Sequence, residues 1–127
     1  MHKIDTICIV DDDPIHVFTT KRALRNSQIC RQIITFDDGK SAYDGLLSID
    51  TEDLPDLILL DINMPIWDGW NFLDEFKKLD LGKNIKIFIT SSSQDPDDIT
   101  RAKYYEQVHS FIFKPFSIEK LKAELTD

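Results

Sequence analysis

Five short apolar segments recur along the chain, and each is followed by a longer segment in which apolar residues have helical spacing. The segment Leu57–Leu60 shows no polar alternation, which is typical of a strand buried on both faces of a sheet. Strands that alternate with helices form parallel sheets joined by right-handed crossovers, with helices on both faces. The pattern therefore predicts an α/β fold with five helices and five parallel strands, at residues 6–10, 32–36, 57–60, 85–89 and 111–113.

Capping residues mark where several of the predicted helices begin. Asp13 precedes Pro14 and Asp95 precedes Pro96, so each pair offers a side-chain cap and then a proline suited to the first helical position. Asp68 can cap the helix that follows the central strand. The sequence therefore predicts helix starts close to residues 14, 69 and 96.

The apolar positions also predict which helix faces point inward. We expect the first helix to bury Val17, Phe18 and Leu24. Tyr104 and Tyr105 are expected on the fourth helix, where they are candidate contacts for a partner or ordinary packing residues.

Length, composition and charge indicate one globular domain spanning residues 1–127. Hydrophobic residues make up 42% of the chain, and the net charge is −8. This charge argues against binding to nucleic acid or to an anionic membrane surface. No apolar run approaches the roughly 20 residues of a membrane span. Two isolated cysteines, Cys8 and Cys30, favour reduced thiols and a cytoplasmic location.

Charged and hydroxyl side chains follow four of the predicted strands. Because the carboxyl ends of parallel strands meet at one edge of a sheet, we expect these side chains to share a pocket. Crowded carboxylates repel one another unless a divalent cation lies among them, and Mg²⁺ is the hard cation that such oxygens suit. Carboxylates, a lysine and a hydroxyl suit phosphoryl transfer to an aspartate. The residues are Asp11, Asp12, Asp13, Asp61, Thr90, Ser91 and Lys114.

In combination, these segments resemble the receiver domain of two-component response regulators, and the resemblance covers essentially the whole chain. It implies a flavodoxin-like, doubly wound sheet with strand order 2-1-3-4-5. The matching segments are Val10–Pro14, Leu60–Pro65, Asp68–Gly69, Thr90–Ser91 and Lys114–Phe116.

The resemblance implies a role for each acidic residue. Asp61 is expected to be the phosphoacceptor. Asp12, Asp61 and the backbone carbonyl of Asn63 are expected to bind Mg²⁺, with Asp11 acting through water.

The same resemblance assigns the other residues of the pocket. Thr90 is expected to hydrogen-bond the phosphoryl group and Lys114 to pair with it, with a cis peptide bond between Lys114 and Pro115. Phe111 stands where the family often has a switch tyrosine. Phe111 has no hydroxyl, so we expect its inward rotamer to be populated even without phosphate.

The function expected from these residues is a phosphorylation-dependent signalling switch. It would take phosphate from a histidine kinase or histidine phosphotransfer protein, catalyse only its own phosphorylation and dephosphorylation, and then act on a downstream protein. One alternative is an aspartyl-phosphate phosphatase of the haloacid-dehalogenase kind, which needs a second aspartate where this chain has Asn63. The other is a phosphate-independent scaffold of the same fold. We expect His2, His16 and His109 to be surface residues.

Overall fold

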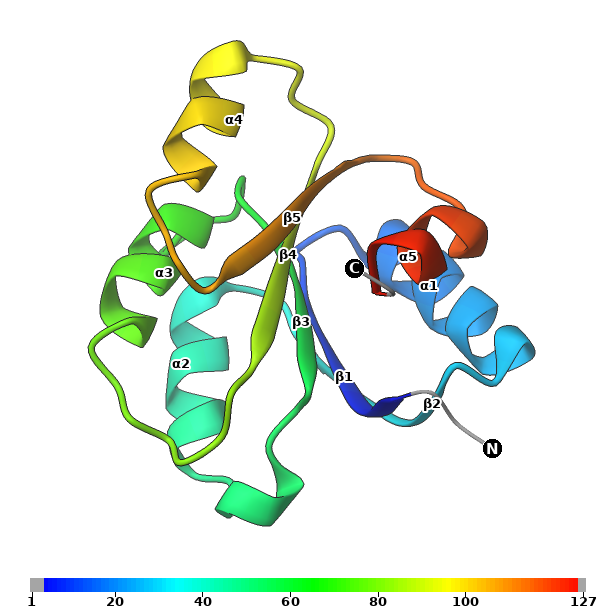
Figure 1. Cartoon of the computed structure of the whole chain (residues 1–127), viewed down its shortest axis with the longest axis horizontal. Helices are drawn as coiled ribbons and strands as arrows, with labels where there is room; N and C mark the ends of the chain where they lie inside the picture. The colour runs from blue at the N-terminus through cyan, green and yellow to red at the C-terminus, as the bar shows by residue number, and fades with distance from the viewer. Residues whose placement is uncertain (1–3, 126–127) are drawn as a thin grey trace.

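One parallel five-stranded sheet forms the centre of the molecule (Figure 1). The computed structural model describes residues 4–125. Within that range the strand order is β2-β1-β3-β4-β5, as the sequence predicts. The strands are β1 (Ile4–Val10), β2 (Cys30–Phe36), β3 (Leu57–Asp61), β4 (Lys86–Ser91) and β5 (Val108–Phe113).

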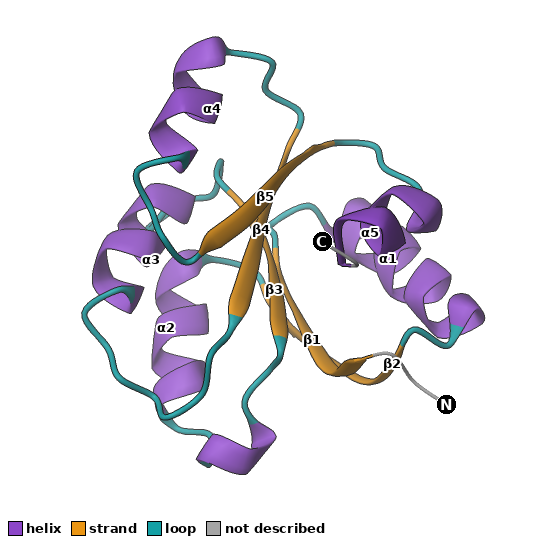
Figure 2. Ribbon diagram, viewed as in Figure 1, coloured by secondary structure: helices purple, strands orange, loops and turns teal. Residues whose placement is uncertain are grey.

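Helices cover both faces of this sheet, as Figure 2 shows: α2, α3 and α4 lie on one side, and α1 and α5 lie on the other. A short 3₁₀ helix, Thr51–Asp53, precedes β3 and has no counterpart in the sequence prediction. No helix in the described part of the chain is long and apolar enough to cross a membrane. The helices are α1 (Pro14–Ser27), α2 (Gly39–Leu47), α3 (Gly69–Phe76), α4 (Pro96–Ala102) and α5 (Ile118–Leu125).

The central strand β3 contributes to two apolar cores, one on each face of the sheet. Leu57 and Leu59 pack in the core that contains Leu24 of α1 and Leu121 of α5. Ile58 and Leu60 pack in the core that contains residues of α2 and α3. Successive side chains of a strand point to opposite faces, so a strand covered on both sides needs apolar residues at every position.

The predicted caps are present at the helix starts. The Asp13 carboxylate accepts a hydrogen bond from the Ile15 N–H at 3.0 Å. Asp68 and Asn71 form a reciprocal capping box at the start of α3. The Asp95 carboxylate accepts from the Asp97 N–H at 3.0 Å. These contacts fix the start of each helix relative to the strand that precedes it.

One prediction about helix α1 is wrong. Phe18 is 63% exposed, although we expected it on the inner face. Leu24 is fully buried, and the buried residue that shares its face is Thr20. Successive helical residues are about 100° apart, so Phe18 points away from this face and instead lines a groove between α1 and β2.

The placement of the two tyrosines on the fourth helix is also wrong, because α4 ends at Ala102. Tyr105 is buried, and its hydroxyl donates a 2.7 Å hydrogen bond to the Asp74 carboxylate of α3. Tyr104 is 82% exposed. Tyr105 is therefore a packing residue, and only Tyr104 is available as a surface contact.

Both described cysteines are free and buried, in β1 and β2. Desolvation raises the pKa of Cys8 and of Cys30, so both thiols remain protonated at neutral pH.

Candidate functional site

Three carboxylates meet where strands β1 and β3 end. The two strands are parallel neighbours, with Val10 opposite Leu60, so Asp11 and Asp61 follow them side by side. Oxygen atoms of Asp11, Asp12 and Asp61 lie within 4.8 Å of one another. The structure thus brings Asp61 to the adjacent pair Asp11 and Asp12, although Asp61 follows Asp11 by 50 residues in the sequence.

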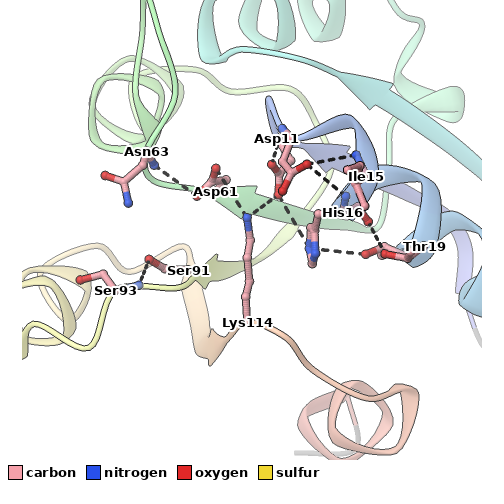
Figure 3. A network of polar contacts seen from close by, with 11 residues as sticks. Asp11, Ile15, His16, Thr19, Asp61, Asn63, Ser91, Ser93 and Lys114 are labelled. Carbon is pink, nitrogen blue, oxygen red and sulfur yellow. Dashed lines mark hydrogen bonds and ion pairs between the residues drawn. The ribbon is translucent and has the colours of Figure 1, made fainter.

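Lys114 lies between two of these acids, as Figure 3 shows. Its Nζ is 2.7 Å from Asp11 Oδ2 and 3.6 Å from Asp61 Oδ2. Its backbone N–H donates to the Ser91 carbonyl at 2.8 Å, and the peptide bond to Pro115 is cis. The ammonium group is therefore held at the end of β5 and is closer to Asp11 than to Asp61.

Burial and charge repulsion both raise the pKa of Asp61, which is only 5% exposed. Desolvation is the largest cause that raises the pKa of Asp61 to about 6, and the neighbouring Asp11 and Asp12 carboxylates add to it. Lys114 opposes this rise, as does the hydrogen bond from the Asn63 N–H to Asp61 Oδ1 at 3.2 Å. The site therefore has more negative charge than its own cation offsets.

These residues have the donor set that a hard divalent cation requires. Carboxylate and carbonyl oxygens are the ligands that Mg²⁺ binds in proteins, and a dication among the three acids would relieve their repulsion. Asp11 and Asp61 are buried, whereas Asp12 and Asn63 are exposed. The chemistry of the residues therefore fits a magnesium site that is open to water on one side.

Two further predicted residues lie on the neighbouring strands. Thr90 is the direct partner of Asp61 in the pairing of β3 with β4, and it is 2% exposed. Phe111, on β5, pairs with Ile89 of β4, is partly buried, and packs against the core on the α2, α3 and α4 side. Its ring lies 5.5 Å from that of the exposed Phe113. Thr90 and Phe111 thus connect the site with the outer strand of the sheet.

The sequence interpretation missed His16, which we expected to be an ordinary surface residue. Its Nε2 lies 3.7 Å from Asp11 Oδ2, and its side chain is largely buried. Burial is the largest cause that lowers the pKa of His16, and the charge of Lys114 adds to it, against the opposing effect of Asp11 and Asp13. Helix α1 begins directly after Asp11, Asp12 and Asp13, so its first turn lies beside the end of β1. This closeness in the sequence could have indicated that His16 lies near the acids. His109 is exposed on β5, and His2 lies outside the described residues.

Comparison with known proteins identifies the family. Residues 7–126 match the sequence model of the response regulator receiver domain, so this chain belongs to that family. The probable methanogenesis regulatory protein FilR2 of Methanothrix harundinacea is 32% identical, over 95% of this chain and 79% of its own length. Several other curated relatives are longer, and this chain spans 47% of their length.

Solved structures show the same fold. A two-component response regulator from Cytophaga hutchinsonii superposes with a TM-score of 0.85 at 28% identity, covering 98% of this chain and 96% of that one. The phosphorylated cyanobacterial phytochrome response regulator RcpA gives a TM-score of 0.79 at 31% identity, covering 95% and 86% of the two chains. The chain is therefore a response regulator receiver domain, a module of phosphorylation-dependent signalling in two-component systems.

Proposed function

We propose that this receiver domain accepts a phosphoryl group on Asp61 from a histidine kinase or a histidine phosphotransfer protein, with Mg²⁺ in the site. The observation that carries this proposal is the position of Asp61. It is a buried carboxylate at the carboxyl end of the central strand, with two acids and one lysine around it. A relative of the same fold, RcpA, has been solved in its phosphorylated form.

In the transfer step, an Asp61 carboxylate oxygen forms a bond to phosphorus. The phosphorus–nitrogen bond of the donor phosphohistidine breaks at the same time, and its imidazole leaves. Lys114 Nζ, 3.6 Å from Asp61, is placed to pair with a phosphoryl oxygen. The Thr90 hydroxyl on the adjacent strand is placed to donate to a second oxygen after a local movement.

Asp12, Asp61 and the backbone carbonyl of Asn63 would hold the magnesium ion, and Asp11 would act on it through water. When bound, the ion supplies positive charge against the phosphoryl oxygens, which repel the acids of the site. The charge of the ion would also oppose the burial that raises the pKa of Asp61, and so would favour the ionised carboxylate that attacks phosphorus.

We further propose that the chain catalyses only its own phosphorylation and dephosphorylation and signals through protein contacts. Asn63 stands where a phosphatase of the haloacid-dehalogenase kind needs an acid–base aspartate. The net charge of −8 argues against direct contact with nucleic acid. A cytoplasmic location suits partners of this kind.

Intact-mass measurement after incubation with acetyl phosphate tests the central claim. We expect wild type to gain one phosphoryl group when Mg²⁺ is present and none when it is chelated. Asp61→Asn should gain none, because an amide is not a nucleophile for phosphorus. Glu106→Gln, which makes the same chemical change at an exposed acid, should behave as wild type. Equal phosphorylation of Asp61→Asn and wild type would place the phosphoacceptor elsewhere.

A further inference from the structure

His16 is a polar side chain of the site that the transfer step above does not use. Its Nε2 lies between two oxygen atoms, 3.7 Å from Asp11 Oδ2 and 3.4 Å from the Thr20 hydroxyl. Its ring meets Phe116 edge to face, with 5.7 Å between centroids. Phe116 follows Lys114 by two residues, so His16 contacts both Asp11 and the loop that carries Lys114. Figure 3 shows His16 and Lys114 directed at the same carboxylate from different elements.

Asp11 depends on few hydrogen-bond donors. In the described part of the chain, Oδ1 accepts from the Asp13 N–H at 2.9 Å and Oδ2 accepts from Lys114 Nζ at 2.7 Å. Asp11 is 2% exposed, so bulk water has little access to it. A buried carboxylate oxygen that loses its donor is destabilised by more than an exposed one, because no solvent replaces the bond.

Phosphorylation of Asp61 would add new hydrogen-bond acceptors near the Lys114 ammonium group. A phosphoryl group brings about −1.5 to −2 charges and three acceptor oxygens to the Asp61 side of the lysine. This charge draws Nζ away from Asp11, from which it is now 2.7 Å, toward Asp61, from which it is 3.6 Å. Because Asp11 would act on the magnesium ion through water and would not bind it directly, Oδ2 then lacks the donor that Lys114 supplied.

We propose that His16 is a positioning residue that becomes the donor to Asp11 Oδ2 when Lys114 turns to the phosphoryl group. An uncharged imidazole with its proton on Nε2 can donate in this way. The present separation of 3.7 Å is longer than a hydrogen bond of about 2.9 Å, so the ring must move closer, away from the Thr20 hydroxyl. Phe116 makes this movement responsive to Lys114, because the loop between them is short.

The inference rests on the proposed phosphorylation of Asp61, and nitrogen-15 spectra of the histidine rings test it directly. Adding beryllofluoride with magnesium, as a stable phosphoryl analogue, should produce a protected Nε2–H signal for His16. Lys114→Met should produce the same signal in the free protein, because Asp11 has then lost its lysine. His109 lies near the start of β5, where its ring stacks on Phe88, and serves as the internal control that should gain no protected Nε2–H signal.

Two substitutions separate hydrogen bonding from packing. His16→Leu fills the space without a donor, so phosphorylation by acetyl phosphate should slow by about tenfold, the effect of one lost hydrogen bond to a charged group. His16→Gln keeps an N–H donor and should remain within about twofold of wild type. His109→Leu is the matched control at an exposed position. Thermal unfolding should confirm that each variant is folded before rates are compared.

The possible outcomes distinguish the role of His16 from the proposed phosphorylation of Asp61, on which it rests. If wild type accepts no phosphate, the proposed function fails and the role of His16 fails with it. If wild type is phosphorylated and both His16→Leu and His16→Gln are phosphorylated as fast as wild type, His16 has no positioning role. If both variants are equally slow, the ring acts by packing against Phe116, and the donor role is wrong. An unchanged His16 signal in the beryllofluoride complex also overturns it.

Discussion

At the scale of single residues, Asp61, the proposed phosphoacceptor, destabilises the metal-free fold at neutral pH. The side chain is buried beside two other acids, which raises its pKa to about 6. The folded state therefore holds the Asp61 proton more tightly than the unfolded chain does. The contribution of this carboxyl to folding stability is fully present below its ordinary pKa, near 3.8. That contribution is lost as the pH rises through the folded-state pKa of about 6. The three neighbouring carboxylates that suit a cation therefore destabilise the metal-free fold at neutral pH, because their charges repel one another.

Asp61→Asn should therefore stabilise the metal-free protein at pH 7.5, by about 1–3 kcal/mol, since each pKa unit corresponds to about 1.4 kcal/mol. An asparagine cannot ionise and avoids the buried negative charge. The gain should shrink toward zero at pH 4, where Asp61 is largely protonated. Urea unfolding at both pH values, with a chelator present, measures the difference.

Glu106→Gln is the control for this experiment, because Glu106 is exposed and the substitution removes the same charge. Its effect should be small at both pH values. A gain for Asp61→Asn that is the same at pH 4 and pH 7.5 would show that ionisation of Asp61 is not the cause.

At the scale of elements, the loop between β3 and α3 holds Asp61 in place. The Gly69 N–H donates to the Ile62 carbonyl at 3.1 Å, and the capping box of Asp68 and Asn71 fixes the first turn of α3. A Cβ at residue 69 would lie 2.7 Å from the Asp61 carbonyl oxygen and 2.7 Å from Ile62 Cα. Both are backbone atoms, so neither can rotate away. The absence of a side chain at Gly69 lets helix α3 approach the end of β3.

Gly69→Ala should therefore destabilise the fold by about 1–3 kcal/mol and displace Asp61, because the added methyl group overpacks a fixed backbone. Phosphorylation by acetyl phosphate should slow, and amide spectra should change around Asp61. Denaturant unfolding and intact-mass kinetics measure the two effects.

Gly82→Ala provides a matched comparison in a distant turn. Gly82 has φ of +74°, and an added Cβ there would contact only Thr51, at 3.6 Å. Backbone strain should lower stability by about 1 kcal/mol without affecting the phosphorylation rate. Similar slowing in both variants would attribute the effect of Gly69→Ala to lost stability alone.

At the scale of the whole molecule, strands β4 and β5 connect the acidic site with an outer surface. Thr90 is paired with Asp61 on one side and with Ile112 on the other. Phe111 is next along β5 and is only partly buried, so its ring has space to move relative to the core. A movement of Thr90 toward a phosphoryl group would leave space that the Phe111 ring can fill. The face around β5 is therefore where we expect phosphorylation to change partner affinity.

Phe111→Tyr should make the inward position of this ring less populated in the free protein. A tyrosine must bury its hydroxyl, at a cost of about 1–3 kcal/mol if no partner is found, whereas phenylalanine has no such group. Ring carbon-13 spectra with and without beryllofluoride should show a larger change for the tyrosine variant. Phe88, which is fully buried in the sheet, is the reference ring. Identical spectra of residue 111 in both states, for wild type and variant, would show that this ring does not take part in switching.

The sequence by itself determined the order of elements and the chemical character of the site. Asp61, Asp11 and Lys114 each follow an apolar strand, and parallel strands bring their carboxyl ends to one edge. The caps at Asp13 and Asp68 are equally local, because a capping side chain bonds to a backbone group only two or three residues away. Features that depend on neighbouring residues in the chain, or on the rule that parallel strands share an edge, could be predicted.

Only the tertiary structure decided which side chains meet at longer range. Phe18 is exposed and Tyr105 is buried because of how far each helix extends and which face it turns to the sheet. Ile66 has φ of +67°, a conformation that its branched side chain disfavours and that the surrounding loop imposes. His16 reaches Asp11 because helix α1 lies against the end of β1. These positions depend on packing between elements, whereas hydrophobic periodicity describes each element alone.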